Sequence, residues 1–302
     1  MRSGGWRPFW TSLLASLLVL VPLVGGTVLL SRQQLRAQLR QAARSESGVP
    51  VQLPRTTDQL TVLLCVSGEQ PGFVLAYLNA SQNCVHLLGV PAVLTVPFAD
   101  EQAALAQCYA AAGPARCREA LRTPLSLPED TRYLALSPAL LRTLTGRYGS
   151  FRVGFSGALT PAEQALCGRA NTIEGLSATE AEAFLSSLPQ TIPPEHRAAA
   201  RAVVWDAFFR QNRELLPAAL PQALRDNSTA LLTDLTAQDY YRLETILEFL
   251  ANNTAPVQSD ALPGTWEPDT GLYRLNDDSR AAVQTFFNVS PTRGQASSAS
   301  EP

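Results

Sequence analysis

Three apolar segments follow one another between residues 59 and 90. They are residues 59–66 (QLTVLLCV), 73–79 (FVLAYLN) and 84–90 (CVHLLGV), and the turn-rich SGEQPG and the polar ASQN separate them. Apolar residues occupy consecutive positions in each segment instead of alternating with polar ones, which is typical of strands that are covered by helices on both faces. The pattern therefore predicts the central strands of a buried sheet.

Strands and helices alternate in the rest of the domain. Ser177 and Glu180 have the spacing of a capping box at the start of one helix, and Pro138 suits the first turn of another. Helices are predicted over residues 100–122 with a break at Gly113-Pro114, 138–146, 178–188, 194–216 and 234–248, and strands over 131–136 and 150–155. Strands alternating with helices, followed by a helical half, predict an α/β/α sandwich with a mixed central sheet.

A long apolar segment precedes this domain. Residues 8–31, between Arg7 and Arg32, are 24 residues without a charge, and a helix of that length crosses a hydrocarbon core of about 30 Å. A core helix is rarely so long without a charge. A cleaved signal peptide is the stronger alternative, but its apolar region usually has only ~7–15 residues and ends at a small-residue cleavage site. We predict one retained N-terminal transmembrane helix over residues 1–31.

The remaining boundaries follow from local composition. Four arginines recur every four residues in RQQLRAQLRQAAR, which predicts a stalk helix whose charged face meets either solvent or anionic lipid headgroups. A segment with Gly and Pro follows, so residues 32–58 are interpreted as stalk and linker. The domain is predicted over residues 59–290, and residues 291–302 as a flexible tail.

Charge and composition exclude several classes of function. The formal net charge of −2 gives no basic footprint, so nucleic acid is not an expected partner. The chain has no lysine, which excludes Schiff-base and P-loop lysines. His86 and His196 are the two histidines, and no cysteine has a C-x-x-C partner, so the sequence predicts no metal site of its own.

The positions of the cysteines are relevant to whether the domain lies in an oxidising or a reducing compartment. Cys108 and Cys117 flank the Gly113-Pro114 break, so they are predicted to form a disulfide in an oxidising compartment. Cys65 and Cys84 lie on neighbouring predicted strands and form a second candidate pair, which leaves Cys167 free. The alternative is a set of five buried thiols in a reducing compartment.

The order of these elements resembles the LytR-CpsA-Psr family of cell-envelope proteins over most of residues 59–287. The matching segments are Gly89-Val90-Pro91 after the third strand, Cys108-Tyr109-Ala110 with Gly113, LRTLTGRYGSFRV (141–153), LSATEAEAFL (176–185), and Thr233-Asp234-Leu235 with Leu262-Pro263-Gly264. The resemblance implies transfer of glycopolymers from a polyprenyl pyrophosphate carrier to peptidoglycan. It also implies arginine forks that hold the pyrophosphate and carboxylates that hold Mg²⁺, the groups that stabilise such dense negative charge.

Most of the arginines and carboxylates that the resemblance implies are replaced by other residues in this chain. The positions that carry an acid or an arginine in the family's pattern correspond here to Gly72, Ala92, Val93, Ser186 and Leu188. Glu195 is a possible residual acid, and Arg197 and Arg201 lie one turn apart on one helix face. They are the candidate phosphate-binding residues. The alternative is an ordinary solvated helix face.

The resemblance and the sequence together predict a degenerate relative of this family that binds or regulates and does not catalyse. Its expected partners are the membrane and a polyprenyl-phosphate lipid or cell-wall glycopolymer. The alternative is an active Mg²⁺-dependent transferase with displaced ligands, drawn from Asp100, Glu101, Arg116, Arg118 and Arg122. An unrelated α/β enzyme has little support, because no nucleophile-elbow pattern is present.

The location of the domain follows from the same resemblance. Arg2 and Arg7 precede the apolar segment and four arginines follow it, so the charge count alone favours a cytoplasmic domain. Long C-terminal domains are translocated largely regardless of charge. The cysteines and the resemblance therefore decide the orientation, and we predict a single-pass protein of the cell membrane with an extracytoplasmic C-terminal domain.

Overall fold

The computed structural model describes residue 55 and residues 58–167 and 172–288. The predicted transmembrane helix, most of the stalk and linker, and the predicted tail lie outside these described residues. No helix within them is both long and apolar enough to cross a membrane.

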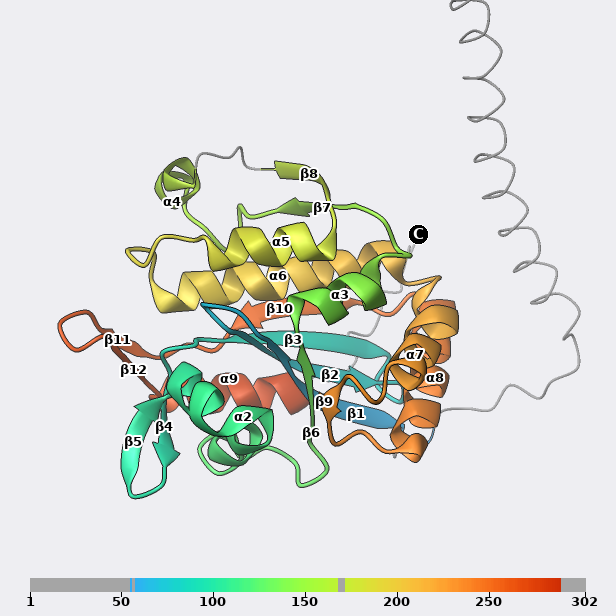
Figure 1. The fold of residues 1–302 in the computed structure, drawn as a ribbon, viewed down its shortest axis with the longest axis horizontal. Helices are drawn as coiled ribbons and strands as arrows, with labels where there is room; N and C mark the ends of the chain where they lie inside the picture. Colours follow the sequence, from blue (N-terminus) through green and yellow to red (C-terminus); the bar gives the residue numbers. More distant parts are fainter. Residues whose placement is uncertain (1–54, 56–57, 168–171, 289–302) are drawn as a thin grey trace, which may run out of the picture. The chain divides into compact units, whose positions relative to one another are not determined.

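Six strands form the central sheet, in the order β10-β3-β2-β1-β6-β9 (Figure 1). They are β1 (Gln59–Val66), β2 (Gly72–Asn79), β3 (Cys84–Val90), β6 (Arg132–Leu136), β9 (Leu232–Thr233) and β10 (Val257–Ala261). The pairs β1–β6 and β3–β10 are parallel, and the other three neighbouring pairs are antiparallel. The sheet is therefore mixed, as predicted, and the carboxyl ends of β1, β3, β6 and β10 lie at one edge.

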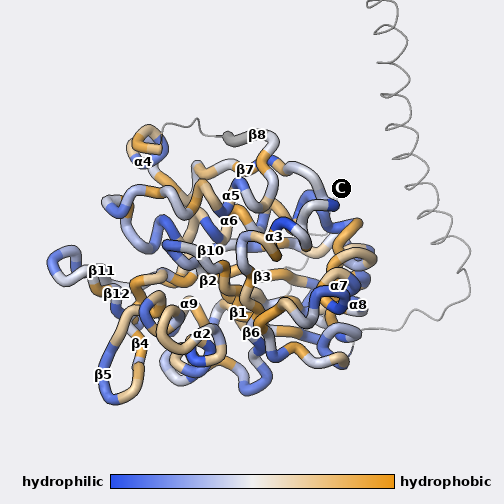
Figure 2. The backbone as a smooth tube through the Cα atoms, viewed as in Figure 1, coloured by the Kyte–Doolittle hydropathy of each residue, from blue (hydrophilic) through white to orange (hydrophobic). Residues whose placement is uncertain are grey.

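Helices cover both faces of this sheet, which explains the apolar sequence of its central strands. One apolar cluster joins a face of the sheet to five helices, and a second cluster joins the other face to two helices. Neighbouring residues of β1 divide between them, because Val62 belongs to the first cluster and Leu63 to the second. Figure 2 shows the hydrophobic residues gathered along the central strands, whereas the tip of the hairpin formed by β11 (Thr265–Glu267) and β12 (Leu272–Arg274) is hydrophilic.

The two helical layers complete the predicted α/β/α sandwich (Figure 1). The first layer contains α3 (Pro138–Thr145), α5 (Ala178–Ser186), α6 (Pro194–Asn212), α7 (Leu216–Asp226) and α8 (Ala237–Asn252). The second contains α2 (Leu105–Arg122) and α9 (Asp277–Asn288). Short elements decorate the layers: β4 (Thr95–Phe98), β5 (Glu101–Ala104), β7 (Phe151–Gly154), α4 (Pro161–Leu166), β8 (Thr172–Leu176), β11 (Thr265–Glu267) and β12 (Leu272–Arg274).

Three predicted helices have clearly different boundaries in the structure, and one of them is α8, which begins at Ala237 and ends at Asn252 instead of spanning residues 234–248. The helix expected from residue 100 begins at Leu105, because the preceding residues pair with β4 as strand β5, and this pairing overrides their helical propensity. The helix expected to end at Leu216 ends at Asn212, and α7 begins at Leu216. Pro217 accounts for this break, since proline fits the first turn of a new helix but not a helix interior.

All five cysteines are free thiols in the structure, so neither predicted disulfide is formed there. The pairing of Cys65 with Cys84 was wrong for a topological reason. Strand β2 lies between β1 and β3, and Cys65 and Cys84 lie near opposite ends of β2, opposite Phe73 and Asn79. Cys108 and Cys117 do lie together in the second apolar cluster, where the thiol of Cys117 donates to the carbonyl oxygen of Leu105 at 3.7 Å.

Candidate functional site

The candidate arginines lie where α6 begins, over the edge formed by the carboxyl ends of four strands. Gly89 brings the helix close to the sheet, since a β-carbon at this position would stand 2.1 Å from the carbonyl oxygen of Ala198. Phe73 pairs with Val90, which places the start of β2 at the same edge. This edge is where open α/β sheets commonly bind ligands.

Arg201 belongs to a buried network of charged and polar groups. Its Nε lies 3.2 Å from Oε2 of Glu182, and the indole nitrogen of Trp205 donates to the other carboxylate oxygen at 3.0 Å. Arg201 is 8% exposed and Glu182 5% exposed. The prediction placed Arg201 on the correct helix but missed its partner, so one of the two candidate cations is already neutralised within the fold.

The side chain of Arg201 occupies the space directly beside Gly72. A β-carbon at Gly72 would stand 2.1 Å from Nε of Arg201 and 2.3 Å from Cζ. The guanidinium of Arg201 therefore fills the space that a side chain at position 72 would need. Any larger residue at this position requires the guanidinium of Arg201 to leave its present position.

Arg197 has a different environment from Arg201. Its Nη1 donates to Oε1 of Gln190 at 2.6 Å, and no carboxylate of the described residues pairs with it. Its Nε is buried without a hydrogen-bond partner in the described part of the chain. Burial lowers the pKa of Arg197, and the nearby charge of Arg201 lowers it further.

Glu195, the predicted residual acid, lies in the first turn of α6 but is directed towards β12. The Tyr273 hydroxyl lies 3.3 Å from Oε2 of Glu195 and 2.8 Å from the carbonyl oxygen of Leu262. Burial and the charge of Glu195 both raise the pKa of Tyr273. Within the described residues no ion pair joins Glu195 to Arg197 or Arg201, so the structure does not bring the predicted acid and cations into direct contact.

His196, the next residue of α6, contacts Glu163 of α4. Nδ1 of His196 lies 2.8 Å from Oε1 of Glu163, and Oε2 of Glu163 accepts from the backbone of Thr160 at 2.7 Å in a capping box. Burial alone would raise the pKa of Glu163, but these hydrogen bonds leave the pKa below its ordinary value. The first two turns of α6 therefore present Arg197 as the cation without an acidic partner among the described residues.

Comparison with known proteins identifies the fold. No protein-family model and no curated protein matches the sequence. Among solved structures, TagT bound to LIIa-WTA is 17% identical with a TM-score of 0.58, covering 82% of this chain and 98% of that chain. A LytR-Csp2A-Psr enzyme from Actinomyces oris is 20% identical with a TM-score of 0.55, covering 79% and 94%. Bacillus subtilis TagT gives a TM-score of 0.57 at 15% identity, covering 79% and 94%. The domain has the LytR-CpsA-Psr fold.

Three of the substituted positions of the LytR-CpsA-Psr pattern are packing residues in this chain. Leu188 is 2% exposed within the first apolar cluster, and Ala92 and Val93 pack against the second. The backbone oxygen of Val93 accepts from the amide of Tyr273 at 3.3 Å. Hydrophobic contacts therefore occupy places where the resemblance implied charged ligands.

The residues present do not fit the Mg²⁺ that the resemblance implies. Gly72 and Val93 offer no side-chain oxygen, and both carboxylate oxygens of Glu182 are engaged by Arg201 and Trp205. Magnesium takes carboxylate and water oxygens in near-octahedral geometry. Within the described ranges, no three His, Cys, Asp or Glu side chains cluster in a way that could hold a metal ion.

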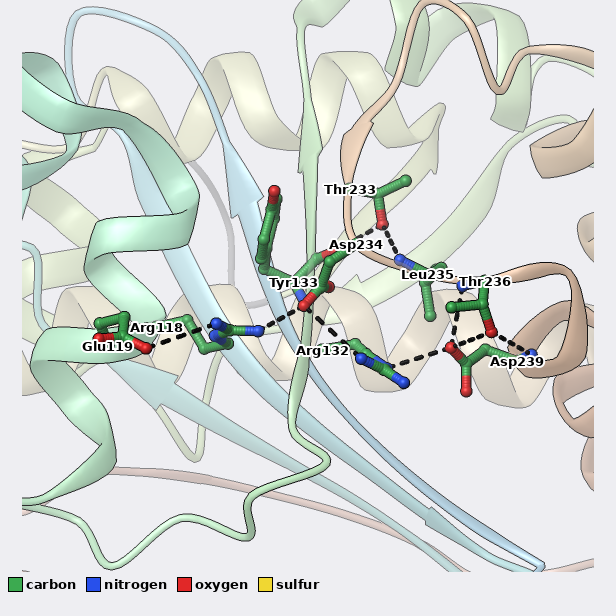
Figure 3. A network of polar contacts seen from close by, with 9 residues as sticks. All are labelled: Arg118, Glu119, Arg132, Tyr133, Thr233, Asp234, Leu235, Thr236 and Asp239. Atoms are coloured by element: carbon green, nitrogen blue, oxygen red, sulfur yellow. Dashed lines mark hydrogen bonds and ion pairs between the residues drawn. The ribbon is translucent and has the colours of Figure 1, made fainter.

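The charged residues named for a displaced active site lie elsewhere. Arg118 forms an ion pair with Asp234, and its guanidinium lies 5.7 Å from the ring centre of Tyr133 (Figure 3). Asp234 also accepts from the Tyr133 amide at 2.8 Å, and Arg132 lies 3.1 Å from Asp239, the capping-box partner of Thr236 at the start of α8. This network ties α2, β6 and α8 together, so the structure gives Arg118 a structural role.

Glu182 and Trp205 are the residues of this site that the sequence reasoning missed. Glu182 lies on the buried face of α5 with Ala178, Ala181 and Leu185, at helical spacing. An acid on an otherwise apolar helix face is a signal for a buried ion pair, because an unpaired charge there is strongly unfavourable. The sequence does not say which cation is the partner, since Arg201 lies on a different helix.

Proposed function

We propose that this chain is a membrane-anchored, extracytoplasmic protein of bacterial cell-envelope biogenesis that binds a phosphate-bearing ligand and does not transfer it. Arg197 carries the proposal, because it is a partly buried cation that no carboxylate of the described residues neutralises. An anion fits beside it, since guanidinium and phosphate form charge-assisted hydrogen bonds. Arg201, one helical turn further along α6, is the second cation and is paired with Glu182.

The expected ligand is a polyprenyl-phosphate lipid or a cell-wall glycopolymer. The fold supports this class, because TagT, which has the same fold, has been observed bound to LIIa-WTA. The absence of catalysis is supported by the side chains at the site. Catalysis of phosphoryl transfer requires cations and a metal at the developing charge, and removing one such preorganised group typically costs about 10²–10³ in rate.

Binding and transfer are tested on the full-length protein in detergent. We expect saturable binding of a polyprenyl phosphate, weakened by Arg197→Ala and unaffected by Arg142→Ala, which removes an exposed arginine from α3. No glycopolymer should leave a polyprenyl pyrophosphate donor, with or without Mg²⁺. Equal binding by all three proteins would refute the anion site. Mg²⁺-dependent turnover that Arg197→Ala abolishes would instead establish the transferase.

The membrane anchor and its orientation are a separate part of the proposal. They rest on the 24 uncharged residues at positions 8–31 and on the fold of the domain that follows. Bacterial alkaline phosphatase fused after residue 302 should be active, because this enzyme needs disulfides that form only outside the cytoplasm. An inactive fusion that is produced at full length would place the domain in the cytoplasm and contradict the proposed location.

A further inference from the structure

A cavity lies on the face of the sheet opposite Arg201, between β3, β10 and α9. Its volume is about 330 Å³. His86 and Leu88 of β3, Gln258 and Asp260 of β10, and Phe286 of α9 are among its lining residues. The parallel register pairs Gln258 with His86 and Asp260 with Leu88, so these four side chains project from the same face of the sheet.

His86 is the buried polar group of this cavity. It is 4% exposed, and its ring contacts are with Tyr77 and Phe286, at 6.5 and 5.9 Å between ring centres. Neither ring nitrogen has a hydrogen-bond partner in the part of the chain that the structure describes. Burial lowers the pKa of His86, and the charge of Asp260 opposes this only partly. The ring is therefore neutral near pH 7, with one nitrogen that accepts a hydrogen bond.

The other polar groups of the cavity are mainly acceptors. Asp260 is exposed and forms no ion pair with a described residue, and Gln258 is likewise exposed. The hydroxyl of Thr285 donates to the carbonyl oxygen of Ala281 at 2.9 Å, which leaves its oxygen lone pairs available. No arginine lines the cavity. The site thus offers acceptors and one negative charge, together with apolar walls that include Leu88.

A ligand that matches this chemistry carries several N–H donors and a positive charge on a short apolar body. We propose that the cavity binds an organic ammonium group, with Asp260 as its ion-pair partner and His86 as a hydrogen-bond acceptor. The imidazole supports this, because its nitrogens have no hydrogen-bond partner among the described residues and its unprotonated nitrogen can accept a hydrogen bond from a ligand N–H. The proposal is independent of the anion site, which lies on the other face of the sheet and has the opposite charge.

The sequence makes a direct measurement possible, because His86 and His196 are the two histidines of the chain. Full-length protein in detergent, labelled with ¹³C-histidine, gives two Cε1–H signals, and His196→Gln assigns them. We expect n-butylammonium to shift the His86 signal saturably, and n-butanol to require at least about 10-fold higher concentration, since charge-assisted hydrogen bonds are the stronger ones. Nα-acetyl-lysinamide carries the same ammonium group on a lysine side chain. It therefore tests whether a lysine residue can bind in the cavity as n-butylammonium does.

Variants distinguish binding that depends on the charge of Asp260 from binding by apolar contacts alone. Asp260→Asn keeps the shape of an exposed side chain and should weaken n-butylammonium binding about 10-fold. The matched control is Glu129→Gln, which removes an exposed carboxylate that does not line the cavity and should leave the binding unchanged. Equal shifts with the alcohol and the ammonium, no saturable shift with either amine, or unchanged binding in Asp260→Asn would each overturn the proposal.

Discussion

The buried pair of Arg201 and Glu182 makes a prediction about stability that depends on both partners. Removing either one alone leaves the other charge unpaired at a position less than a tenth exposed. We predict that Arg201→Met or Glu182→Leu is strongly destabilising, whereas the double variant is much less so. The replacement residues keep the approximate volume but carry no charge.

The magnitude follows from the contacts. Breaking a buried pair from one side costs about 3–5 kcal/mol, whereas replacing both charges by apolar residues is often close to neutral. In the double variant the indole N–H of Trp205 loses its acceptor, which adds about 1–3 kcal/mol. The coupling energy between the two sites is therefore expected to be about 3 kcal/mol or more.

The wild type, the two single variants and the double variant form a double-mutant cycle. Urea unfolding of these four full-length proteins, followed by circular dichroism, measures the coupling energy. Arg225→Met and Glu244→Leu provide the control cycle, because this pair has a similar separation of 3.1 Å but side chains that are 30% and 41% exposed. An exposed pair of this kind contributes about 0–1 kcal/mol. Additive single effects at Arg201 and Glu182, or a coupling no larger than that of the control, would refute the reasoning.

Three further predictions concern other parts of the fold. Gly89→Ala should lower the thermal midpoint far more than Gly68→Ala, because only the former meets helix backbone, at 2.1 Å. The pKa of Glu163 is lowered by folding, so its stabilisation is present above its unfolded value of about 4.3 and lost as pH falls through the folded value; the destabilisation caused by Glu163→Gln should shrink between pH 7 and pH 3. Oxidation of the full-length chain should join Cys108 to Cys117 and stabilise it by ~2–3 kcal/mol, and peptide mapping that finds both thiols free after oxidation would contradict this.

The elements that could be predicted are those whose local sequence determines them. The three central strands are apolar on both faces, and the Ser177 and Glu180 capping box marks the start of α5, which the structure confirms. β5 was predicted as helix because its pairing with β4 is not visible in its own composition. Strand order is also invisible locally, and for that reason Cys65 and Cys84 were mistaken for neighbours.

The site was only partly predictable, because its decisive contacts join elements that are distant in the sequence. Arg197 and Arg201 share a helix face, and their proximity follows from helical spacing. The ion pair of Arg201 with Glu182 and its contact with Gly72 depend on how α5, α6 and β2 pack together. These contacts involve one substituted position of the family pattern: Gly72 leaves the space that Arg201 fills, and Glu182 supplies the carboxylate that pairs with Arg201.

Glu182 therefore affects stability and the proposed binding in opposite directions. It stabilises the fold by pairing with Arg201, but it also reduces the positive potential beside Arg197. Glu182→Gln keeps an acceptor for Trp205 and raises the net charge of the site by one. We expect this variant to unfold at lower urea concentration yet bind polyprenyl phosphate about 10-fold more tightly at low salt, with the gain reduced at high salt. Glu244→Gln is the control, and unchanged or weaker binding by a folded Glu182→Gln protein would show that the anion does not bind near these arginines.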